Sequence, residues 1–326
     1  TATTVGFLYP QGDARRDSGF SIYYIGINIG AGVAPIICGW VGQRVDFRAA
    51  FGLAGIFMIA GLIQFWFTKK PLGDAGRVPV VAATPVDRKM LAYGSLGLVA
   101  AVVAVAASRV ELTAVADGFA ILLLVAVTAT FAGLLLSQDF TSIEKKRIQS
   151  VLVLFIASAV FWSIFEQAGS TLNLFADRST ANQIFGFDYP SSWFQSVNSA
   201  FLWLLAPVLA WLWVKLDDKN PPVMVKFATG LFGAGAGFLV MMLAAQLAGA
   251  SGKASPLWLV LCYFFHTFGE LCLSPVGLSA MTKLAPARIA GLTMGVFFLS
   301  ISVGNFLGGR LSSFYESMPL ENLFGY

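Results

Sequence analysis

Residues 150–176 read SVLVLFIASAVFWSIFEQAGSTLNLFA, an apolar run that is interrupted by one carboxylate, Glu166. Residues 256–280 read PLWLVLCYFFHTFGELCLSPVGLSA and hold Glu270 in a similar setting. A helix needs about 20 mostly apolar residues to cross ~30 Å of hydrocarbon, so each run is long enough to span a bilayer. An acid at that depth is costly and by default marks an ion or substrate pathway. The two runs therefore predict membrane helices with two functional acids.

The composition of the whole chain agrees with this reading. It is 57% hydrophobic and only 12% charged, with a mean hydropathy of +0.76, whereas a soluble domain carries about 25% charged residues. Long apolar runs without alternation favour helices over a β-barrel. The net charge of +4 is spread too thinly for a nucleic-acid partner. We expect an all-α membrane protein surrounded by a lipid bilayer.

Nine spans of this kind can be read from the sequence. They are Phe20–Trp40, Ala49–Phe67, Met90–Ala107, Gly118–Leu136, Ser150–Ala176, Ser192–Leu216, Val225–Ala248, Pro256–Ala280 and Ile289–Phe314. Thr1–Tyr9 resembles the end of a further helix, and the last span stops shortly before the final residue. We therefore expect a chain that is truncated at both ends.

The basic residues predict the orientation of these spans. Of the 21 lysines and arginines, 15 fall in one set of alternate loops and 6 in the other. Because cytoplasmic loops carry an excess of Lys and Arg, the first set is expected inside. The span that begins at Phe20 then runs outward.

The third and fourth spans consist mainly of Ala, Val and Leu and carry almost no polar residues. They are expected to form a lipid-facing hairpin that links two helical bundles. After them, Thr141-Ser142-Ile143-Glu144 resembles a capping box that opens the next helix.

Signals for catalysis or metal binding are weak. There is no Ser/His/Asp set and no zinc-ligand spacing, and an odd number of cysteines inside predicted spans argues against a disulfide framework or a metal cluster, so we expect no enzyme, metal or cofactor. The glycine run at 233–237 lies inside a span and predicts close helix packing rather than nucleotide binding. The single histidine, His266, shares a helix face with Glu270. It is either a proton relay or a histidine bonded inside the bundle.

Amides inside other spans suggest a polar cavity. Asn28, Asn198 and Asn305 can each be simple contacts between helices, but together with two acids they favour a shared cavity. Trp162 precedes Glu166 by one turn and is either an aromatic wall of that cavity or a packing residue. A channel would favour repeated pore motifs or a re-entrant loop, neither of which is visible. The residues favour a transporter.

Three stretches carry a resemblance to a known family. Residues 9–31 read YPQGDARRDSGFSIYYIGINIGA, residues 165–175 read FEQAGSTLNLF, and residues 269–279 read GELCLSPVGLS. In this order they closely resemble the motifs of the proton-dependent oligopeptide transporters, a branch of the major facilitator superfamily. The resemblance covers essentially the whole chain and implies two six-helix bundles, joined in bacterial members by an extra transmembrane hairpin. Residues 1–67 would then be the end of helix four with helices five and six, residues 68–148 the linker with the hairpin, and residues 149–326 helices seven to eleven.

The resemblance also implies roles for particular residues. Glu270 would face the amino terminus of a peptide and pair with a lysine on helix four. Asn28 and Asn198 would hold the peptide backbone, with Ser274 one turn beyond Glu270. Glu166 would couple protonation to the outer gate.

Two further residues are expected at the peptide site. Trp162 is a candidate wall, and Phe297 stands where many members have a tryptophan, so an apolar wall remains while the indole N–H is lost. The implied function is proton symport of di- and tripeptides by alternating access across a bacterial inner membrane, without a cofactor other than the coupling proton. The alternatives are a carrier of nitrate or another small anion on the same fold, and a non-transporting membrane scaffold.

Overall fold

The computed structural model describes residues 8, 15–73, 85–107, 111–284, 286 and 289–325. The predicted helix end at Thr1–Tyr9 lies outside these residues apart from Leu8, so it is not tested. Contacts divide the chain into two units. The first contains residues 1–28 and 54–125, and the second contains residues 29–53 and 126–326.

The described residues are almost entirely helical. The long helices are α2 (Arg15–Arg44), α3 (Phe47–Thr68), α4 (Pro85–Ala107), α5 (Leu112–Leu136), α6 (Ser142–Phe165), α8 (Phe194–Leu216), α9 (Val223–Ser251), α10 (Pro256–Leu284) and α11 (Ala290–Ser312). Shorter helices are α7 (Thr171–Arg178) and α12 (Leu320–Gly325), with 3-10 turns η1 (Lys70–Leu72), η2 (Glu166–Gly169), η3 (Ser191–Trp193) and η4 (Asp217–Lys219).

Eight segments of the described residues are long and apolar enough to cross a membrane. They coincide with eight of the nine predicted spans, and the ninth, Met90–Ala107, is covered by helix α4. The multi-pass helical architecture is therefore confirmed. The capping box is confirmed as well, because the Thr141 side chain accepts from the Glu144 N–H and the Glu144 carboxylate accepts from the Thr141 N–H.

The predicted span Ser150–Ala176 lies within the apolar segment Ser142–Arg178, and its helix is interrupted near the middle of the predicted span. Helix α6 ends at Phe165, the 3-10 turn η2 follows at Glu166–Gly169, and α7 begins at Thr171. Gly169-Ser170 lies at the break, and such pairs commonly kink helices. The Gln167 side-chain amide donates to the backbone oxygen of Ser163 at 3.2 Å, which satisfies a carbonyl near the break.

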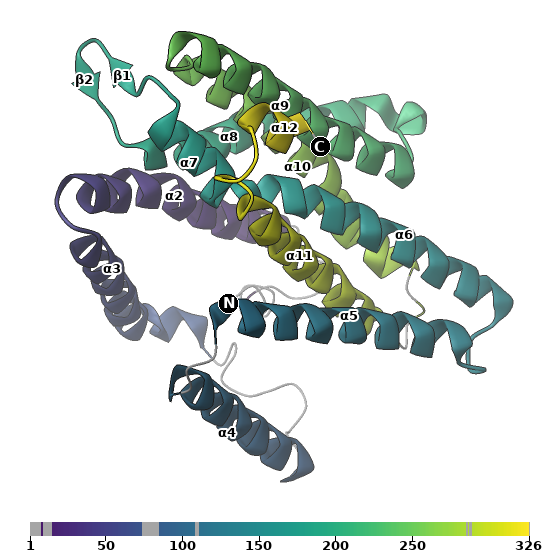
Figure 1. The fold of residues 1–326 in the computed structure, drawn as a ribbon. Helices are drawn as coiled ribbons and strands as arrows, with labels where there is room; N and C mark the ends of the chain where they lie inside the picture. The colour runs from purple at the N-terminus through teal and green to yellow at the C-terminus, as the bar shows by residue number, and fades with distance from the viewer. Residues whose placement is uncertain are drawn as a thin grey trace. The chain divides into compact units, whose positions relative to one another are not determined.

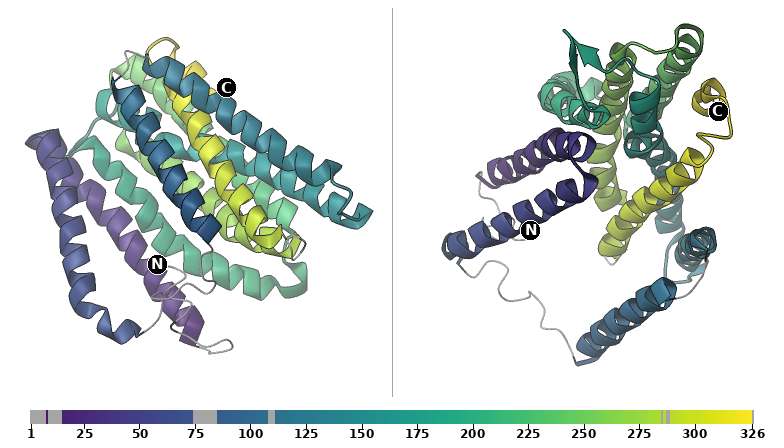
Figure 2. Two further views of the ribbon diagram at one scale, coloured as in Figure 1. Left: turned by 90° about the horizontal axis from the view of Figure 1, so that it is seen from below. Right: turned by 60° about the vertical axis from the view of Figure 1, so that its left-hand side comes forward.

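In the second unit, α6, α9, α10 and α11 lie side by side as one bundle (Figures 1 and 2). One apolar core surrounds Phe175 and Met241, between α7, α9, α10 and α12. Another surrounds Phe161 and Leu273, between α6, α10 and α11. The latter half of α5 also packs on α6, where the Phe131 and Phe155 rings meet edge to face at 5.4 Å.

Two short strands, β1 (Gln183–Ile184) and β2 (Phe187–Asp188), form an antiparallel hairpin in which Ile184 pairs with Phe187. Phe185 and Gly186 connect them with φ angles of 49° and 81°, as a type I′ turn requires. The hairpin stands at one end of the helices (Figure 1).

Candidate functional site

Helix α10 carries Glu270 and lies unusually close to α9. A Cβ added to Gly269 would lie 2.7 Å from the backbone oxygen of Gly230, and one on Gly233 would lie 2.9 Å from that of Phe265. Only glycine fits where two helix backbones approach this closely. Since successive residues of a helix are about 100° apart, Glu270 faces another direction, toward α8.

Asn198 of α8 meets Glu270 in a short hydrogen-bond network. Its amide nitrogen donates to Glu270 Oε2 at 3.2 Å and to Thr267 Oγ1 at 2.9 Å. The Thr267 hydroxyl in turn donates to the backbone oxygen of Tyr263 at 2.7 Å. Both amide N–H groups of Asn198 are thus used, and its oxygen Oδ1 remains as an acceptor beside the Glu270 carboxylate.

A cavity of about 260 Å³ lies beside this network in the second unit. Its lining comes from α2, the region around η2, α8 and α10. The lining residues are Ala31, Pro35, Phe165, Glu166, Ala168, Gly169, Gln195, Asn198, Ser199, Tyr263 and His266. None of these is a lysine or an arginine. The polar groups at the cavity are therefore a carboxylate, amides and hydroxyls, together with one imidazole.

Glu166 is the first residue of η2 and lines this cavity. Its carboxylate makes no hydrogen bond or ion pair within the described part of the chain. The structure therefore places Glu166 and Asn198 at one cavity and joins Asn198 to Glu270. An unpaired carboxylate in such a place suits the uptake of a proton or a cationic group.

The other predicted site residues lie elsewhere. The Ser274 hydroxyl is buried without a hydrogen-bond partner. Phe297 is 2% exposed and fills the space over Gly277, where an added Cβ would lie 2.6 Å from its ring. The ring of Trp162 packs on Phe165 at 5.2 Å, and its Nε1 is buried without a partner.

Asn28 belongs to the first unit, so it is described apart from the acids. It lies in helix α2 and is buried.

His266 packs mainly against aromatic rings and α9. Its ring lies 6.1 Å from that of Phe165 and 5.7 Å from that of Phe238, and an added Cβ on Gly237 would clash with it at 2.5 Å. Its Nε2 is 3.7 Å from the Cys262 sulfur. No hydrogen bond joins His266 to Glu270 among the described residues, so the geometry favours a packing role over a relay.

Sequence reasoning missed Thr267, Tyr263 and Gln195. Tyr263 and Thr267 precede Glu270 by seven and three residues, which places all three on one helix face, and this spacing could have identified them. Gln195 lies three residues before Asn198 and lines the cavity. Within the described ranges, no group of three or more His, Cys, Asp or Glu residues could hold a metal ion.

Comparison with known proteins gives consistent matches over nearly the whole chain. The model of the POT family matches residues 2–323. The peptide transporter YePEPT of Yersinia enterocolitica is 36% identical over 334 residues, which covers 98% of this chain and 65% of the relative. The di-/tripeptide transporter of Lactococcus lactis subsp. cremoris is 34% identical, with 98% of this chain and 67% of the relative covered.

A solved structure is similar over the same extent. A variant of a peptide transporter, POT, crystallised in complex with alafosfalin, has a TM-score of 0.90 and 40% identity over 99% of this chain and 66% of its own length. This chain thus spans about two thirds of the length of these proteins. The helical fold, the matched family model and the similar structure agree: the chain belongs to the POT family and has the major facilitator fold of its transporters.

Proposed function

We propose that this protein is a proton-coupled symporter that imports di- and tripeptides by alternating access across a bacterial inner membrane. The single observation that carries the proposal is the network in which Asn198 joins Glu270 beside a cavity lined by Glu166. The choice of cargo and membrane is supported by the similar bacterial proteins, which are named as peptide and di-/tripeptide transporters.

The polar groups suit the amino terminus of a peptide. The Glu270 carboxylate and the free Oδ1 of Asn198 are adjacent acceptors, and an ammonium group offers three donors to them. The Thr267 hydroxyl holds the Asn198 amide in place, so the acceptor pair is preorganised. The resemblance to the family also assigns Ser274, Trp162 and Phe297 to the peptide site and Asn28 to the peptide backbone, and none of the four lines the described cavity.

Glu166 and Glu270 take the proton-coupling and gating roles in this proposal. An ionised carboxylate that is removed from water requires a compensating charge or donor. Binding of a proton or of a peptide ammonium removes that requirement. The conformations that the two bundles prefer then depend on whether the acids are occupied.

The proposed division of the chain follows the order of helices that the resemblance to the family implies. Residues 1–67 supply the end of helix four with helices five and six, residues 68–148 the linker with its hairpin, and residues 149–326 helices seven to eleven. A small-anion carrier is not favoured, because no lysine or arginine lines the described cavity.

The test is uptake of labelled di-alanine by liposomes that contain the full-length protein. With an inward proton gradient, Glu270→Gln should abolish accumulation, because the amide keeps the shape and an acceptor oxygen but cannot carry a proton. Counterflow without a gradient should persist. Glu316→Gln, which changes an exposed acid, serves as the control.

Unchanged gradient-driven uptake by Glu270→Gln would contradict the assignment. Inhibition by nitrate but not by di-peptides would favour an anion carrier. Flux no higher than that of protein-free liposomes would favour a scaffold.

A further inference from the structure

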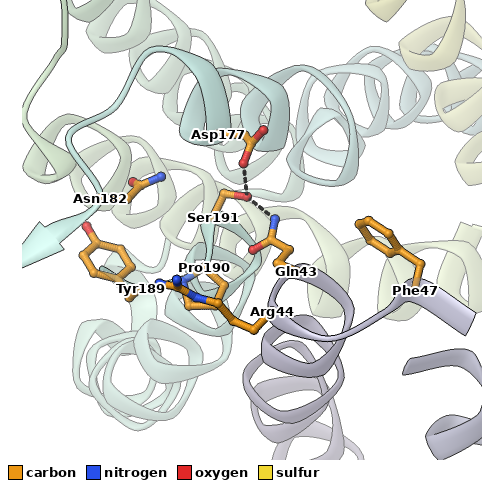
Figure 3. Close-up of a pocket in the computed structure, with 8 residues that line it drawn as sticks. All are labelled: Gln43, Arg44, Phe47, Asp177, Asn182, Tyr189, Pro190 and Ser191. Carbon is orange, nitrogen blue, oxygen red and sulfur yellow. Dashed lines mark hydrogen bonds between the residues drawn. The ribbon is translucent and has the colours of Figure 1, made fainter. Parts of the chain in front are cut away.

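The end of helix α2 is joined to the segment that precedes α8 by a chain of hydrogen bonds (Figure 3). Gln43 Nε2 donates to Ser191 Oγ at 2.7 Å, and Ser191 Oγ donates to Asp177 Oδ1 at 3.3 Å. Next to them, the Arg44 guanidinium donates to the backbone oxygen of Asp188. Gln43, Arg44, Asp177 and Ser191 line a hollow of about 340 Å³, and Ser191 itself is buried.

On the cavity side of these hydrogen bonds, helix α2 packs closely against the turn η3 and against helix α8. A Cβ on Gly39 would lie 2.0 Å from Ser192 Oγ, and one on Gly32, seven residues earlier, would lie 3.2 Å from the Cβ of Ser199. Between these levels, Trp193 Nε1 donates to the backbone oxygen of Ile36 at 3.1 Å. These contacts join α2 to Ser192, Trp193 and Ser199 at three successive levels.

The contact lies directly beyond the cavity. Ala31 and Pro35 of α2 and Gln195 and Asn198 of α8 line the cavity, whereas Gln43 and Ser191 lie further toward one end of the same elements. The basic residues predict that this end faces outward. The contact therefore lies between the cavity and the end of these elements that is expected to face outward.

We propose that Gln43, Ser191 and Asp177 form a polar latch that holds the cavity closed toward the outer side. The inference rests on the proposed alternating-access function, in which α2 and α8 belong to different bundles and must separate to admit peptide. The latch is suited to repeated opening, because each hydrogen bond biases an equilibrium by only about two- to tenfold. The Gln43–Ser191 bond buries no ion pair, so its rupture leaves no unpaired charge.

The experiment measures opening by thiol labelling in the full-length protein. Gln195→Cys is the reporter, because Gln195 lines the cavity beneath the latch and makes no side-chain hydrogen bond among the described residues. Cys38→Ser removes the partly exposed native thiol, and Cys262 and Cys272 are fully buried. An impermeant maleimide is added outside right-side-out vesicles without substrate.

Ser191→Ala removes both hydrogen bonds and should raise the labelling rate about tenfold, and Gln43→Ala, which removes one, should raise it about two- to tenfold. Asp177→Asn keeps an acceptor oxygen and should stay within about twofold of the parent. The double variant Gln43→Ala/Ser191→Ala should label no faster than Ser191→Ala, since the two residues share one bond. Ser312→Ala, at an exposed hydroxyl bonded only within α11, is the matched control.

Equal labelling of Gln43→Ala and the parent would overturn the latch, as would an equal increase in Ser312→Ala. Because Gln43 is exposed, this variant remains informative if Ser191→Ala folds poorly. Di-alanine uptake by the protein without the reporter is measured in parallel. Faster labelling without any peptide uptake would reject the proposed cargo and retain the latch, whereas uptake with unchanged labelling would reject the latch alone.

Discussion

At the scale of single residues, the most informative side chain is Asn198. An amide has two donors, and both are directed, one to Glu270 and one to Thr267. Thr267 can accept from Asn198 because its own proton is donated to the backbone of Tyr263. The orientation of the acceptor oxygen therefore depends on a hydroxyl that itself has no place in the cavity lining.

Thr267→Val tests this dependence, because it keeps the shape and removes the hydroxyl. We expect the KM for di-alanine to rise about three- to tenfold, which corresponds to the loss of one hydrogen bond of ~1 kcal/mol. The maximal rate should change little. Thr229→Val, at an exposed hydroxyl that bonds within α9, should leave both unchanged. An unaltered KM in Thr267→Val, measured in liposomes, would show that Asn198 does not need this anchor.

At the scale of elements, the contact between α9 and α10 determines which way Glu270 faces. In a bilayer the lipid tails are as apolar as the helix surfaces, so close packing of small residues is what drives association. Gly230, Gly233, Gly237 and Gly269 supply this packing. By contrast, an added Cβ on Gly235 meets nothing within 4 Å, although it lies in the same glycine-rich run.

Gly269→Ala should therefore separate α9 from α10 and lower the stability by about 1–3 kcal/mol, as overpacking does elsewhere. Gly235→Ala is the matched control and should be neutral or stabilising by up to ~1 kcal/mol through helix propensity. Thermal unfolding of the full-length protein in detergent measures both. If the two variants unfold at the same temperature, the close contact has no energetic role.

At the scale of the whole molecule, the charge bias sets the orientation in the membrane. Glu316 follows α11, is 76% exposed on its side chain and pairs with Arg178 at 2.9 Å. Lys146 lies near the beginning of α6, at the opposite end of that span. The positive-inside rule places Glu316 outside and Lys146 inside.

Cysteine accessibility in intact cells checks this placement. In a background with Cys38→Ser, Glu316→Cys should react with an impermeant maleimide, and Lys146→Cys should react only after permeabilisation. The exposed Arg178–Glu316 pair contributes at most ~1 kcal/mol, so its loss leaves the fold intact. The reverse labelling pattern would invert the orientation and move the proposed latch to the cytoplasmic side.

Much of this protein follows from the sequence alone. The helical class and the positions of eight confirmed spans were readable because bilayer thickness and the need to satisfy every backbone group leave long apolar runs few alternatives. The capping box at Thr141 was readable because its hydrogen bonds join residues three apart. The two acids stood out because a carboxylate in an apolar run has no structural reason to be there.

Tertiary structure decided everything that joins distant parts of the chain. The Asn198–Glu270 contact spans 72 residues and the Gln43–Ser191 contact spans 148, and no local pattern states which helices will be neighbours. The same reason explains why Gly237 is covered by a neighbouring helix while Gly235 is not, since only the path of α10 determines which glycine is covered. The sequence alone therefore determined which segments cross the membrane and which polar groups they carry. Packing between helices, which depends on shape over long chain separations, decided how those groups meet.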